Sequence, residues 1–152
     1  MAGVLDREYL GMGEEVEQFE NALTKYLGRT AVCVSSGTAA LHLALQGLGI
    51  GEGDEVLVQS LTYVASFQAI SATGAKPIAC EINPTTFSID LKDAERRITK
   101  KTKAIMPVHY GGSVGALSEI YNFAEKYKLR IIEDAAHAFG SKYKGKRVGS
   151  FG

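Results

Sequence analysis

Five short apolar runs recur along the chain at intervals of about 25 residues, and this repeat limits the possible folds more than any other feature. The runs are 31–34, 55–59, 77–80, 103–108 and 130–134. Segments with the apolar spacing of helices lie between them, at 38–48, 62–72, 91–98 and 117–127. Strands that alternate with helices at this spacing predict βαβ crossovers, which join parallel strands.

The predicted fold is therefore of the α/β class, with three α/β/α layers around a mostly parallel sheet. The runs lack a clean apolar and polar alternation, as expected of strands covered by helices on both faces. A further amphipathic helix is expected over 14–27, where Gly28 provides a stop signal. We expect a helical segment over 1–30, followed by one α/β domain over 31–152.

The composition argues against several classes of partner. Seventeen basic and seventeen acidic residues give no net charge, so binding to nucleic acid or to a membrane surface through bulk charge is not expected. No apolar run approaches the roughly 18 residues that span a bilayer, and the start of the chain lacks the pattern of a secretory leader. Cys33 and Cys80 are expected to be buried free thiols without a metal. These features predict a cytoplasmic protein.

The residues after each strand are the first candidates for a site, because α/β sheets bind ligands at the carboxyl ends of their strands. The first run is followed by Ser36, Gly37 and Thr38 at the start of a helix. A glycine permits close backbone approach, and the free amides and dipole of a helix start favour an anion such as phosphate. The alternative is an ordinary helix start, in which Ser36 or Thr38 only satisfies backbone donors.

Other side chains follow later strands at the same predicted edge. Tyr63 can stack on a planar ligand, and the alternative is an aromatic that packs in the core. Asp134 ends the fifth run, where a carboxylate can keep the nitrogen of a heteroaromatic ring protonated, as in pyridoxal phosphate, or can cap the next turn. His137 can contact a ring substituent or orient Asp134, or it can be structural. The sequence leaves open whether His109 lines the pocket.

Two nucleotide-binding motifs do not match. A G-x-G-x-x-G turn needs more glycines than Gly37 supplies, and Gln59 stands where a dinucleotide-binding domain would place a carboxylate. The string "GSKYKGKR" has Arg147 in place of the hydroxyl residue of a P-loop. We expect Lys142, Tyr143 and Lys144 to form a solvated hairpin instead.

Several stretches together resemble the large domain of the DegT/DnrJ/EryC1/StrS aminotransferases, which are fold-type I pyridoxal phosphate enzymes. They are "GEEVEQFENALTKYLG", "CVSSGTAALHLAL", "GDEVLVQSLTYVAS", "TKAIMPVHYGG" and "IIEDAAHAFGSKYKGKRVGSFG". By this resemblance Gly37 and Thr38 match the phosphate-binding turn, with Ser36 a weaker match. Tyr63 matches the aromatic that stacks on the cofactor, and Asp134 matches the carboxylate that faces the pyridine nitrogen. His137 matches the position, often Gln or His, near the cofactor hydroxyl.

The resemblance implies a pyridoxal 5'-phosphate enzyme that moves an amino group from an amino acid, usually glutamate, to a nucleotide-linked keto-deoxysugar. Such enzymes are generally homodimers, and their products enter polysaccharides, glycans or antibiotics. The Schiff-base lysine of the family lies downstream of "GSFG", so we expect these 152 residues to be an N-terminal part that is inactive alone. Two alternatives stay open: a sugar dehydratase of the same family, with histidine at the lysine position, and a lysine-free module that binds a ligand without catalysis.

Overall fold

The structure is a computed structural model that describes residues 2–8 and 10–151. The chain divides after Cys33 into two compact units, which are considered separately below. In the part of the chain that the structure describes, no helix has the length and hydropathy needed to cross a membrane.

The first unit contains α1 (Ala2–Asp6) and α2 (Glu14–Leu27). The predicted bounds of the helix at 14–27 are confirmed. It ends at Gly28, whose left-handed φ of 72° suits a residue without a Cβ and whose amide donates to the carbonyl of Thr24.

The predicted strand at 31–34 is wrong, because these described residues form no strand. Side chains of α2 take the place of a strand partner: the amide of Ala31 donates to Thr24 Oγ1, and the amide of Cys33 donates to Glu20 Oε1. Val32 is 72% exposed, so the extended segment is not covered on both faces. The prediction that both thiols are buried is wrong for Cys33, which is half-buried in this segment. It is confirmed for Cys80, which lies in the core, and neither thiol is in a disulfide.

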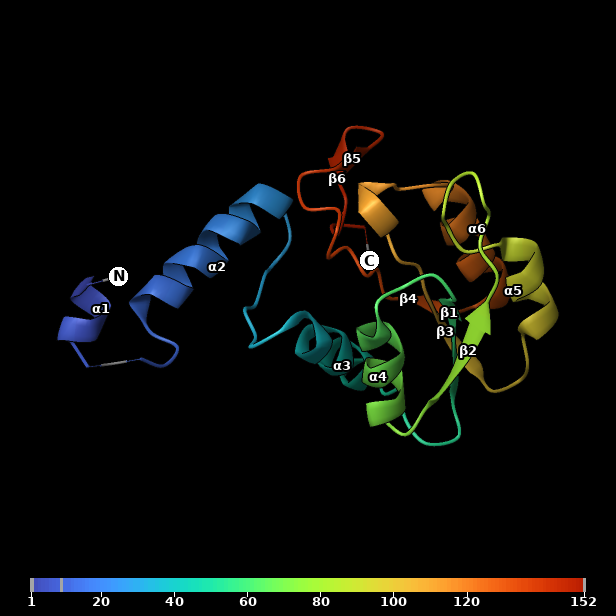
Figure 1. Cartoon of the computed structure of the whole chain (residues 1–152), viewed down its shortest axis with the longest axis horizontal. Coiled ribbons are helices and arrows are strands. Elements are labelled where there is room, and N and C mark those ends of the chain that lie inside the picture. The colour runs from blue at the N-terminus through green and yellow to red at the C-terminus, as the bar shows by residue number, and fades with distance from the viewer. Residues whose placement is uncertain (1, 9, 152) are drawn as a thin grey trace. The chain divides into compact units, whose positions relative to one another are not determined.

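The second unit is built around one parallel sheet of four strands (Figure 1). The strands are β1 (Glu55–Gln59), β2 (Lys76–Cys80), β3 (Thr102–Met106) and β4 (Arg130–Ile131), in the spatial order β2-β1-β3-β4. The expected hairpin is also present, as the antiparallel pair β5 (Lys142–Tyr143) and β6 (Lys146–Arg147).

Helices cover both faces of this sheet (Figure 1). They are α3 (Gly37–Gly47) and α4 (Val64–Ala72) on one face, and α5 (Leu91–Arg97) and α6 (Leu117–Tyr127) on the other, with a short 3-10 turn at Tyr110–Gly112. Alternate residues of β1 enter the two cores: Val56 and Val58 pack with α3 and α4, whereas Leu57 packs with α5 and α6. The predicted three-layer arrangement is confirmed.

The strand order places a topological switch point beside β1. The chain leaves β1 through α4 to β2 on one side, then passes through α5 to β3 on the other side. Right-handed connections that run in opposite directions along a sheet lie on opposite faces of it, as α4 and α5 do here. The chain segments that lead to these two faces separate at the carboxyl ends of β1 and β3. A crevice is therefore expected at that edge.

Strands β3 and β4 end earlier than the predicted runs 103–108 and 130–134, but the chain after each strand continues toward this crevice. The amide of Ile132 donates to the carbonyl of Ile105, and a single bridge pairs Val108 with Asp134. These contacts carry the backbone of Asp134 to the sheet edge.

Candidate ligand-binding site

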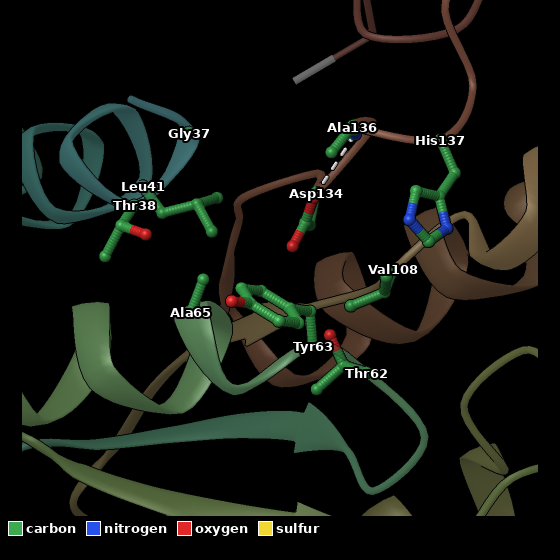
Figure 2. A pocket seen from close by; sticks show the side chains of 10 residues that line it. All are labelled: Gly37, Thr38, Leu41, Thr62, Tyr63, Ala65, Val108, Asp134, Ala136 and His137. Carbon is green, nitrogen blue, oxygen red and sulfur yellow. Dashed lines mark hydrogen bonds between the residues drawn. The ribbon is translucent and has the colours of Figure 1, made fainter. Parts of the chain in front are cut away.

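A cavity of about 250 Å³ opens at the switch point. Five of the six residues predicted for the site line it, and they come from segments far apart in sequence: Gly37, Thr38, Tyr63, Asp134 and His137. Figure 2 shows these residues around one space. Ser36 is not part of the lining, because its side chain is turned to its own helix.

The wall formed by α3 is a helix start with open space in front of it. Ser36 is the N-cap and its hydroxyl accepts a hydrogen bond from the amide of Ala39 at 3.1 Å. In the described part of the chain, the first two helical amides, those of Gly37 and Thr38, have no acceptor. A Cβ added at Gly37 would meet no atom within 4 Å. An anionic group can therefore approach these amides closely.

Tyr63 presents an aromatic face to the same space. It is the N-cap of α4, so the helix begins at Val64, two residues later than the predicted start at 62. Its side chain is 74% exposed, and Figure 2 shows the ring among the side chains that line the cavity, with Ala65 and Val108 to its two sides in this view. The alternative of a buried packing aromatic does not hold for Tyr63. Phe67, one turn further, packs against the core instead.

Asp134 is a nearly buried carboxylate, 9% exposed, held through both its backbone and its side chain. Its amide donates to the carbonyl of Pro107 at 2.9 Å, and its carbonyl accepts from the amide of His109 at 3.0 Å. Oδ2 accepts a hydrogen bond from Ser66 Oγ at 2.9 Å, and Oδ1 accepts one from the amide of Ala136 at 3.3 Å. The carboxylate faces the cavity beside the ring of Tyr63 (Figure 2).

His137 stands at the rim of the cavity. Its Nδ1 accepts a hydrogen bond from the amide of Gly111 at 3.3 Å, so the neutral ring carries its proton on Nε2. The ring of Tyr110 packs edge-on against it, with 5.7 Å between centroids. In the described structure His137 makes no hydrogen bond with Asp134, so the expectation that it orients this carboxylate is not supported.

His109 belongs to the core behind the site and does not line the cavity. Its Nε2 is 2.7 Å from Glu133 Oε2, and Tyr121 donates its hydroxyl proton to Glu133 Oε1 at 2.8 Å. Burial alone would raise the pKa of Glu133, but the hydrogen bonds from His109 and Tyr121 outweigh it and hold that pKa below its usual value. The pair fixes the strand end next to Asp134.

Sequence reasoning missed two buried polar residues that shape the site. Gln59 Oε1 accepts from the amide of Val108 at 3.1 Å, while its Nε2 donates to the carbonyls of Leu61 and Phe87. It therefore ties the carboxyl ends of β1 and β3 together. Ser66, which holds Asp134, is the second. Its only sequence signal is a hydroxyl on an apolar helix that starts at the sheet edge.

The fold and the cavity together define the class of this protein. It is a three-layer α/β domain with a ligand site at the switch point of its sheet. At this site a helix start that can bind an anion, an aromatic face and a carboxylate meet. Within this class, the chain belongs to the DegT/DnrJ/EryC1/StrS aminotransferase family, whose profile it matches over residues 1–152.

Two relatives carry the name GDP-perosamine synthase. The protein from Escherichia coli O157:H7 is 50% identical over 141 residues, which are 92% of this chain and 39% of the relative. The protein from Caulobacter vibrioides is 45% identical over 142 residues, 93% of this chain and 38% of the relative. This chain thus spans about two fifths of the length of these relatives.

A solved structure has a similar fold. NtdA from Bacillus subtilis, crystallised with the bound cofactor PMP (pyridoxamine phosphate), superposes with a TM-score of 0.88 at 40% identity. The match covers 91% of this chain and 32% of NtdA.

Proposed function

We propose that this chain forms the cofactor-binding part of a pyridoxal 5'-phosphate aminotransferase that acts on a nucleotide-linked keto sugar. The observation that carries the proposal is the convergence of the α3 start, the ring of Tyr63 and the carboxylate of Asp134 on one cavity. Family membership and the names of the relatives support the same reaction class.

The cavity suits this cofactor in chemistry and in size. A planar, phosphorylated pyridine needs an anion site, an apolar or aromatic face and a partner for the ring nitrogen. The amides of Gly37 and Thr38 provide the first, the exposed ring of Tyr63 the second, and Asp134 the third. The volume of about 250 Å³ leaves room for the ring and its substituents.

When bound, pyridoxal phosphate supplies an electron sink for chemistry at the carbon next to an amine. Asp134 strengthens that sink, because a carboxylate within reach of the ring nitrogen favours the protonated ring by about 1–3 pKa units. Ser66 and the amide of Ala136 keep the carboxylate in place. His137 offers its Nε2 proton to an oxygen at the rim, since its Nδ1 is already an acceptor.

In our proposal, the lysine amine that binds the cofactor covalently and moves the proton comes from outside this cavity wall. No lysine is among the residues that line the described cavity. We infer that a lysine elsewhere in the full-length protein forms the covalent bond with the cofactor, and that these 152 residues alone do not transaminate. Glutamate as amino donor and a homodimer complete the proposal, by analogy with the family.

Borohydride reduction of the full-length protein mixed with pyridoxal phosphate tests this function. We expect a stable adduct on one lysine that is not among the residues of this chain, found by mass spectrometry of a digest. We also expect transfer of the amino group from glutamate to a nucleotide-linked keto sugar. A protein that binds the cofactor but forms no adduct would overturn the aminotransferase assignment.

A further inference from the structure

We propose that Ser66 is a positioning residue, whose buried hydroxyl fixes the carboxylate of Asp134 in the orientation that meets the ring nitrogen of the cofactor. This inference rests on the proposed function. It concerns a side chain that lies behind the cavity wall and is not among the residues lining it.

The contact joins two elements that are distant in sequence. Ser66 lies in the first turn of α4, and its side chain is fully buried, with 0% of the residue exposed. Its Oγ is 2.9 Å from Asp134 Oδ2 across the top of the sheet. The other oxygen, Oδ1, is held by the amide of Ala136 at 3.3 Å. Each carboxylate oxygen is thus held from a different side, which sets the rotation of the group.

The direction of the protons follows from the chemistry of the partners. An ionised carboxylate can only accept hydrogen bonds, so Ser66 donates its single hydroxyl proton to Asp134. Thr62 Oγ1 lies 2.8 Å from Ser66 Oγ and therefore must donate its own proton to Ser66. The two hydrogen bonds therefore run in one direction only, from Thr62 to Ser66 and from Ser66 to Asp134. Thr62 itself lines the cavity.

Removal of the Ser66 hydroxyl would leave Oδ2 nearly buried without this donor. The carboxylate could then turn toward water or another donor and lose its alignment with the ring nitrogen. The strength of a hydrogen bond depends strongly on the angle between donor and acceptor. Of the contacts with the cofactor, the one between Asp134 and the ring nitrogen would therefore weaken most. Contacts of the phosphate with α3 and of the ring with Tyr63 would change little.

The different effects on the contact with the ring nitrogen and on the other cofactor contacts distinguish a positioning role of Ser66 from a merely structural one. A structural loss would lower the affinity for any ligand of this shape equally. A positioning loss would lower only the part of the affinity that depends on the ring nitrogen. The probe pair is pyridoxal 5'-phosphate and its 1-deaza analogue, which has the same shape and charge on its phosphate but carries carbon in place of the nitrogen.

The experiment measures the dissociation constants of both probes for the full-length protein and its variants. We expect the unmodified protein to bind pyridoxal phosphate at least about tenfold more tightly than the analogue, because the analogue leaves Asp134 without its partner. Ser66→Ala should reduce this preference to about threefold or less. Ser66→Thr, which keeps the hydroxyl, should retain most of it, and Ser71→Ala on the exposed side of α4 should retain all of it.

Thr62→Val provides a second variant if Ser66→Ala does not fold. It keeps the Ser66 hydroxyl but removes the proton that orients it, so we expect a preference between those of the unmodified protein and Ser66→Ala. A protein that binds neither probe would overturn the proposed function itself. A protein that prefers pyridoxal phosphate equally with and without the Ser66 hydroxyl would overturn only the positioning role.

Discussion

The carboxylate of Asp134 connects the sheet to the chemistry of the site. On the proposed function, Asp134→Asn keeps the shape of the side chain but removes the charge that would favour a protonated ring. A difference of 1–3 pKa units at the ring nitrogen corresponds to roughly 10- to 1000-fold in the ratio of protonated to unprotonated ring. We therefore expect the turnover number of the full-length enzyme to fall by about that factor. Steady-state kinetics with glutamate as donor would measure it.

The cofactor affinity of the same variant should fall by about tenfold, the share that the contact with the ring nitrogen contributes, because the phosphate and the ring face contact other residues. Asp6→Asn, an exposed change in the first unit, is the control and should leave both quantities unchanged. Equal turnover in Asp134→Asn and the unmodified enzyme would contradict the role given to this carboxylate.

Tyr63 makes a separate prediction about affinity. Stacking is worth about 0.5–1.5 kcal/mol beyond buried area, so Tyr63→Ala should weaken cofactor binding by roughly 2- to 13-fold. Tyr63→Phe keeps the ring and should bind normally. Because the side chain is 74% exposed, neither variant should lower the melting temperature of the protein without cofactor. Fluorescence titration and thermal unfolding would check both, and a destabilised Tyr63→Phe would show that the hydroxyl is structural.

At this scale, the sequence predicts residues that end a strand or begin a helix at the sheet edge. Tyr63 and His137 follow apolar runs and Asp134 ends one, and parallel strands bring such positions together. Gly37 follows the run 31–34, which forms no strand, and reaches the site as the first residue of α3. Ser66 could not be assigned a partner, because its contact with Asp134 spans 68 residues and depends on how α4 sits over the sheet.

Among the elements, α5 shows how a short helix is fixed to the sheet. Its seven residues are too few for a stable isolated helix. The side chain of Asp90 caps it by accepting from the amides of Lys92 and Asp93. The buried carboxylate of Asp93 accepts from the amide of Glu81 at 2.8 Å, next to the end of β2, and pairs with Arg96 and Arg97. Asp93 is thus the anchor of the element.

The ion pairs and hydrogen bonds of Asp93 predict that the free energy of unfolding depends on pH. The hydrogen bond from Arg97, followed by that from the amide of Glu81, lowers the pKa of Asp93 from 3.8 to about 2. A lowered folded-state pKa stabilises the fold above the unfolded value, so the stabilisation is full above about pH 4 and is lost as the pH falls toward 2. Asp93→Asn should cost about 1–3 kcal/mol at neutral pH, since it removes hydrogen bonds to a charged group.

Denaturant unfolding of the two proteins at several pH values would measure this effect. The gap between Asp93→Asn and the unmodified protein should be constant at neutral pH and should close between about pH 4 and 2. Glu119→Gln, an exposed change on α6, is the control. A gap that stays constant down to pH 2 would show that the charge of Asp93 does not contribute.

Most elements could be predicted from the sequence, because four of the apolar runs form strands and the segments between them have the apolar spacing of helices. The exception is instructive. The segment 31–34 has the composition of a strand, yet a strand exists only where another strand accepts its hydrogen bonds. Thr24 and Glu20 of α2 satisfy those amides instead, and this choice depends on tertiary contacts that local composition does not encode. The observed start of α4 lies two residues after the predicted start at 62, because Tyr63 has extended backbone angles and forms the N-cap.

At the scale of the whole molecule, the two units differ in how they are stabilised. The second unit encloses two apolar cores, one on each face of its sheet. In the first unit, the 14 residues of α2 include none that is buried, and Phe19 on its apolar face is 57% exposed. The amphipathic pattern of α2 therefore belongs to a helix whose apolar face is not covered by the described residues of its own unit.

This difference predicts unequal protection against hydrogen exchange. Helix α6 is the matched control, because it is also amphipathic and of similar length but buries Leu117, Ile120, Phe123 and Ala124. An isolated helix of this length is marginal in water, so the amides of α2 in the 152-residue chain should open locally and exchange at least about 100-fold faster than those of α6. Exchange followed by mass spectrometry would measure both helices in one sample. Equal protection would mean that α2 is stabilised by more than its own hydrogen bonds, and the exposed face of Phe19 would then require a covering surface in solution.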